Sequence, residues 1–122
     1  MSEGVQVADV QVAELDQARH EAQIVVTLNG QPSDRWMELF MESRGRENGA
    51  AGAELHGSTI TLWGRADTDA LVRHVAALRE LIERVNVRIA LEARMARERA
   101  EVQQRRLEDL NRALRRTLGF TD

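Results

Sequence analysis

The sequence predicts an α+β fold: a small, mainly antiparallel four-stranded sheet in the order β-β-α-β-β-α, whose last helix is very long and forms a coiled-coil-like stalk. Three observations support this prediction. Short β-branched segments with alternating apolar and polar residues occupy the first 66 positions. Two similar strand endings each lead into a helix-capping residue. No glycine or proline occurs between Gly64 and Gly119.

The first two strands are predicted over residues 5–12 and 23–28. In the first, valines alternate with polar residues, but the phase slips between Val7 and Val10, which indicates a bulge or a bend. The polar segment 15–21 provides the turn. The second strand is rich in β-branched residues and ends at an Asn-Gly pair.

A helix is predicted to begin after Pro32, with Ser33 accepting hydrogen bonds from its first free N–H groups. Its expected buried face is Trp36, Leu39 and Phe40, flanked by Met37 and Met41. The following segment, residues 43–52, holds three glycines and is predicted to be a mobile loop. A hairpin then joins residues 53–56 to residues 59–63 through His56-Gly57-Ser58.

The two halves of this region resemble each other at an offset of 34 residues. In each half a strand ends in Thr-Leu-x-Gly, two residues pass, and a capping residue (Ser33 or Asp67) starts a helix. We therefore expect two β-β-α units, with both helices on one face of the sheet. The expected core is Trp36, Leu39, Phe40, Ile60, Leu62, Leu71, Val75 and Leu78.

The second helix is predicted from Asp67 to Leu118. At 1.5 Å per residue it would be about 78 Å long, whereas a compact body of the preceding residues would be roughly 25–30 Å across. Most of the helix is then expected to project from the body. A hairpin break within residues 98–106 is the alternative, but that segment has no turn-forming residue and i,i+4 ion-pair spacings run through it.

An apolar stripe follows this helix with the spacing 4-3-4-4-3-4, close to an 11-residue repeat, which is typical of a nearly straight helix. Small residues in its middle would allow a close approach of another helix. Because an exposed apolar stripe needs a partner, we predict self-association, most simply as a homodimer, and leave the orientation and number of the helices open. The predicted oligomerisation residues are Ile82, Val85, Ile89, Ala93, Ala96, Ala100, Leu107, Leu110, Leu114 and Leu118.

We accordingly divide the chain into a head domain (1–89), a helical stalk for oligomerisation (90–118) and a short tail (119–122). Nothing in the 122 residues approaches the roughly 20 apolar residues of a membrane span. The N-terminus lacks the features of a signal peptide, and there is no cysteine, so a cytoplasmic location is expected. Residues 1–86 carry a net charge of −6 and residues 87–118 a net charge of +4. The basic segment is expected to attract either the acidic head of a neighbouring copy or another acidic partner.

The search for catalytic chemistry gives no candidate. His20, His56 and His74 have no metal-ligand spacing, and no nucleophile elbow, phosphate loop or dinucleotide fingerprint occurs. Asp67 and Asp69 are explained by the preference of helix N-termini for negative charge. We therefore expect no enzyme activity, no metal and no cofactor.

Trp63 and the arginine face of the stalk (Arg105, Arg112 and Arg116) are the candidate partner-binding residues. The predicted function is a non-enzymatic scaffold or regulatory adaptor that self-associates through its long helix and presents its head to a protein partner. The alternative is a nucleic-acid-binding regulator that uses the arginine face, although acidic neighbours and the shortage of aromatic residues argue against it. A small-ligand sensor is a weaker alternative.

Overall fold

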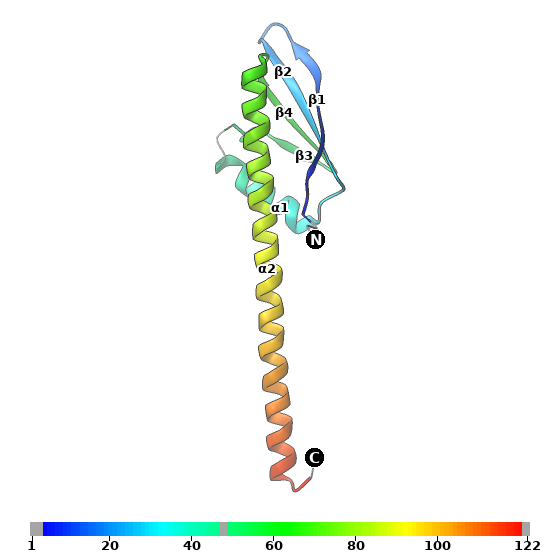
Figure 1. Cartoon of the computed structure of the whole chain (residues 1–122), viewed down its shortest axis with the longest axis vertical. Helices are drawn as coiled ribbons and strands as arrows, with labels where there is room; N and C mark the ends of the chain where they lie inside the picture. The colour runs from blue at the N-terminus through cyan, green and yellow to red at the C-terminus, as the bar shows by residue number, and fades with distance from the viewer. Residues whose placement is uncertain (1–3, 47–48, 121–122) are drawn as a thin grey trace. The chain divides into compact units, whose positions relative to one another are not determined.

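The computed structural model describes residues 4–46 and 49–120, and its α+β architecture confirms the predicted fold class. The elements, in chain order, are β1 (Val7–Asp16), β2 (Glu21–Leu28), α1 (Asp34–Ser43), the short 3-10 helix η1 (Arg44–Arg46), β3 (Glu54–His56), β4 (Thr59–Arg65) and α2 (Thr68–Thr117) (Figure 1). The chain forms two compact units, a head unit (Met1–Ile89) and a C-terminal unit (Ala90–Asp122). Residues 1–3, and the last two residues of the predicted tail, lie outside the described residues.

The head unit contains one antiparallel sheet with the strand order β1-β2-β4-β3. β2 and β4 pair so that Ile24 lies opposite Leu62 and Val26 opposite Ile60, and all four are buried. The first part of α2 lies along this sheet (Figure 1). Burial alternates along β2 and β4 because α1 and α2 cover one face of the sheet only.

Two register shifts in β1 decide which way its side chains point. One lies between Val7 and Asp9 and confirms the predicted bulge, and the other lies between Val12 and Glu14. Each shift inserts one extra residue into β1. The apolar residues before and after the insertion therefore point to the same face of the sheet. Val7, Val10, Val12 and Leu15 consequently all lie opposite residues of the helix-covered face of β2.

Both predicted helix caps are present. The Ser33 hydroxyl accepts a hydrogen bond from the Trp36 N–H at 3.2 Å, and the Asp67 carboxylate accepts one from the Ala70 N–H at 3.1 Å. These bonds satisfy N–H groups that have no partner within the helix. Trp36 then stacks on Phe40 with 5.4 Å between ring centroids, both rings being buried.

The segment predicted as a mobile loop packs into the head unit at several points. Arg44 donates a hydrogen bond from Nη1 to the Ala53 carbonyl oxygen, and Ala50 and Ala53 are fully buried. His74 on α2 donates from Nδ1 to the Gly49 carbonyl oxygen at 2.7 Å, which gives it a structural role. Residues 47–48 of this predicted loop lie outside the described residues.

Helix α2 is continuous from Thr68 to Thr117, which confirms the predicted unbroken helix and excludes the alternative hairpin break within residues 98–106. Its contribution to the head core differs from the prediction in two respects. Leu71 and Val75 are only partly buried, whereas Leu81, which the predicted core did not include, is 1% exposed. Ile82 and Val85 are also buried in this core, so their side chains are occupied within their own chain and are not available to a second copy.

Candidate interaction surfaces

A groove of about 530 Å³ lies in the head unit between the edge strand β1 and the start of α2. Val10 and Val12 of β1 are 37% and 51% exposed although they belong to the helix-covered face of the sheet. Val72 of α2, which also lines the groove, is 61% exposed. The two helices therefore leave the edge strand uncovered. The full lining is Val10, Gln11, Val12, Ile24, Thr68, Leu71, Val72, Val75 and Arg79.

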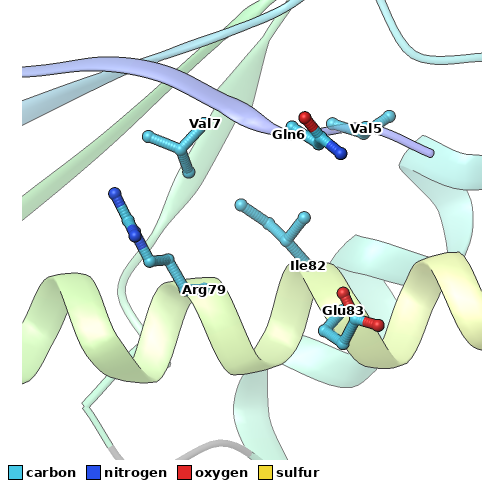
Figure 2. A pocket seen from close by; sticks show the side chains of 6 residues that line it. All are labelled: Val5, Gln6, Val7, Arg79, Ile82 and Glu83. Atoms are coloured by element: carbon cyan, nitrogen blue, oxygen red, sulfur yellow. The ribbon is translucent and has the colours of Figure 1, made fainter. Parts of the chain in front are cut away.

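A second hollow of about 300 Å³ continues along the same seam, lined by Val5, Gln6 and Val7 of the N-terminal segment and by Arg79, Ile82 and Glu83 of α2 (Figure 2). Figure 2 shows Val7 and Ile82 pointing into the gap and Arg79 reaching from α2 toward the strand. Arg79 lines both hollows, and we call the two together the β1–α2 groove.

Asn86 of α2 holds the strand side of this groove in place. Its amide donates from Nδ2 to the Val5 carbonyl oxygen at 2.8 Å, while its Oδ1 accepts from the Val5 N–H at 3.1 Å. The same oxygen accepts from the Trp36 indole Nε1–H at 2.8 Å. One side chain thus ties the entry of β1, helix α1 and helix α2 together, and the width of the groove at Val5 depends on it.

The opposite face of the sheet is open and acidic. Trp63 lies there, opposite Gln23 of β2, and is 41% exposed. Trp63 is therefore part of the surface. The strand register assigns Asp9, Glu14, Asp16, Glu21 and Glu54 to the same face.

The C-terminal unit presents a different surface, because every residue from Ala93 to Phe120 is exposed. The exposed fractions of Leu107, Leu110 and Leu114 are 53%, 53% and 57%. Among the predicted partner-binding arginines, Arg105 and Arg116 are exposed, and Arg112 pairs with Asp109 at 3.3 Å. The predicted i,i+4 pair between Arg94 and Glu98 is present at 3.8 Å. In the part of the chain that the structure describes, these leucines are therefore uncovered.

Residues 4–46 and 49–120 contain no group of three or more His, Asp or Glu side chains placed to hold a metal ion. His56 lies 3.4 Å from Glu54 on the exposed side of the β3–β4 hairpin, and His20 sits in the β1–β2 turn with a positive φ of 55°. None of the helices in the described part of the chain is long and apolar enough to cross a membrane.

The β1–α2 groove was missed in the sequence analysis, although its residues were assigned to the correct elements. The sequence did contain an indication of this groove, because β1 and the start of α2 carry more apolar residues than the packing of the two helices buries. Only the strand order, which places β1 at an edge, identifies which of them stay uncovered. No protein-family profile matches this chain, and comparison with curated proteins and with solved structures gives no significant match.

Proposed function

We propose that this protein is a non-enzymatic scaffold or regulatory adaptor, which self-associates through its C-terminal helical segment and presents its head unit to a protein partner. The single observation that carries the proposal is the row of large apolar side chains, each more than half exposed, on residues 107–118. Burying one leucine side chain stabilises an assembly by about 1.5–3 kcal/mol. Several such side chains on one helix face favour pairing with another helix over exposure to water.

The occupant of this face is a second copy of the same chain. Every copy carries the same row, so pairing two copies covers both rows at once, as an isologous interface requires. The interface consists of the predicted residues that remain exposed: Ala93, Ala96, Ala100, Leu107, Leu110, Leu114 and Leu118, with the partly buried Ile89 at its start.

Light scattering coupled to size-exclusion chromatography tests the self-association. At tens of micromolar we expect a mass near twice the 13.8 kDa of one chain. The double variant Leu107→Glu/Leu114→Glu is expected to be monomeric, because it places four charges in the paired interface. The matched control, Arg105→Glu/Arg112→Glu on the opposite face of the same turns, is expected to remain dimeric. A wild-type chain that is monomeric at this concentration would contradict the proposal.

The client-binding surface that we propose on the head unit is the β1–α2 groove. Its open edge strand, apolar lining and central Arg79 suit a peptide segment with apolar side chains and a carboxylate. Trp63 on the open acidic face is the competing anchor. A pull-down from the native cell distinguishes them, since Val12→Glu would release a client of the groove and Trp63→Ala a client of the open face. Both side chains are exposed, so neither change should unfold the head.

A nucleic-acid-binding regulator is the second candidate, supported by the exposed arginines of the C-terminal unit. A salt-dependent mobility shift that is lost in Arg105→Glu/Arg112→Glu/Arg116→Glu would favour it. The intramolecular pair between Arg112 and Asp109 weakens it, because that arginine is already partly neutralised.

A further inference from the structure

We propose that the helical segments 89–117 of two copies pair in parallel and in register, as a two-stranded coiled coil with Gln103 against its own counterpart in the core. In this arrangement Glu92 of each copy meets Arg97 of the other. The inference rests on the proposed self-association and adds the orientation, the strand number and the residues that determine them.

Considered apart from the head unit, the exposed segment has apolar residues at seven of nine successive heptad core positions. Starting at Ile89, the residues of one face follow each other at alternating steps of four and three, which is the spacing of a left-handed coiled coil. The longer stripe has a double step of four from Val85 to Ile89 and on to Ala93, where burial in the head core ends. A second one, from Leu110 to Leu114 and Leu118, falls at the end of the helix, where the heptad spacing continues to Thr117 instead. The seam consists of Ile89, Ala93, Ala96, Ala100, Gln103, Leu107, Leu110, Leu114 and Thr117.

The charges beside this seam distinguish the two orientations. In a parallel pair, the residue directly before Ala93, Ala100, Leu107 or Leu114 faces the residue five positions later on the other helix. Glu92 therefore meets Arg97 of the second copy, twice by symmetry. In an antiparallel pair that keeps the whole segment overlapped, Arg99 faces Arg106 of the second copy, also twice. Glu92 interacts within its own chain as well, but a carboxylate has two oxygens and accepts several hydrogen bonds.

Gln103 provides an independent argument for parallel pairing. It is the one side chain with an amide among the core positions of the seam. In register and in parallel it meets its counterpart, and each amide can donate to the other and accept from it. In the antiparallel arrangement it faces Ala100, which leaves the amide without a side-chain partner in the core. A polar core residue of this kind specifies register at some cost in stability.

Cysteine cross-linking tests the orientation directly, because the chain has no cysteine of its own. Ala96→Cys and Leu110→Cys introduce one thiol each at a core position. In the parallel pair both variants are expected to form disulfide-linked dimers in a redox buffer. In the antiparallel pair the two thiols at position 96 would be about 16 Å apart and those at position 110 about 25 Å, beyond disulfide reach. Arg105→Cys, on the outer face, is the matched control and should not cross-link.

The outcomes separate this inference from the proposed function. Cross-linking of both core variants in a dimer supports the parallel pair. A dimer in which neither core variant cross-links overturns the parallel arrangement and leaves self-association intact. A trimer or tetramer by light scattering overturns the two-stranded assignment alone. A monomer overturns both proposals.

A charge swap tests the Glu92–Arg97 contact. Glu92→Arg is expected to weaken the dimer roughly 3- to 10-fold, because two attractive contacts become repulsive. Adding Arg97→Glu to the same chain restores the opposite charges and should recover most of the affinity, as measured by the concentration dependence of the mass. The matched control is Glu98→Arg, whose side chain lies on the outer face of the helix and should leave the affinity nearly unchanged. Failure of the double variant to recover affinity would exclude this contact.

Discussion

Asn86 joins three segments of the head unit through its side chain. Its three hydrogen bonds, at 2.8–3.1 Å, reach both backbone groups of Val5 and the indole of Trp36. Trp36 is 3% exposed, and its Nε1–H donates to Asn86 Oδ1. The amide side chain therefore satisfies groups on two other elements that the packing would leave unpaired.

We expect Asn86→Ala to lower the free energy of unfolding by about 2–3 kcal/mol, because a buried donor loses its acceptor and two further bonds are lost. Urea unfolding followed by tryptophan fluorescence measures the change. The control is Asn111→Ala, the same substitution at an exposed position of the same helix, which should alter stability by less than about 0.5 kcal/mol. Equal effects of the two substitutions would contradict the role given to Asn86.

At the scale of elements, the contact between β4 and α2 depends on the absence of a side chain at Gly64. A Cβ atom at this position would lie 2.5 Å from Cδ2 of His74, closer than real Cβ contacts allow. The imidazole can therefore lie against the strand while its Nδ1 reaches the Gly49 carbonyl oxygen. The glycine was recognised in the sequence as a strand end, but its packing role required the position of His74.

Gly64→Ala is expected to destabilise the head by roughly 1–3 kcal/mol through this overlap. Gly30→Ala is the matched control, because nothing lies within 4 Å of its Cβ position, and it should be neutral or slightly stabilising. In the double variant Gly64→Ala/His74→Ala the overlap is absent, so the cost of Gly64→Ala should largely disappear in a double-mutant cycle. Additive effects would show that His74 is not the cause.

At the scale of the whole molecule, the apolar stripe of α2 serves two units in different ways. Leu78, Ile82 and Val85 are buried against the sheet of their own chain, whereas the seam from Ala93 onward is exposed. The stability of the head unit is therefore expected not to depend on protein concentration, while that of the paired segments depends on it by mass action.

A fragment of residues 1–89 is expected to fold and to be monomeric, because all the buried core residues lie within it. Thermal unfolding at several concentrations checks this. The Tm of the fragment should stay constant over a hundredfold range of concentration, whereas the transition of the C-terminal helix in the full chain should rise with concentration. A dimeric fragment would place the interface on the head instead.

The sequence was sufficient where the signal is local. The caps at Ser33 and Asp67, the bulge after Val7 and the unbroken helix through residues 98–106 each follow from residues adjacent in the chain, and the structure confirms them. Hydrogen bonding and backbone preference within a few residues decide such features. The candidate partner residue Trp63 also lies on the exposed side of its strand, as alternation allowed.

The sequence was insufficient where two distant segments meet. Ile82 and Val85 have the same apolar character as Leu107 and Leu114, but the sheet of the same chain covers the first pair and leaves the second exposed. Likewise the valines of β1 resemble those of β2, and only the position of β1 at the sheet edge exposes them. An apolar periodicity shows that a face needs covering, because the hydrophobic effect is non-directional. Which surface covers it is decided by tertiary packing.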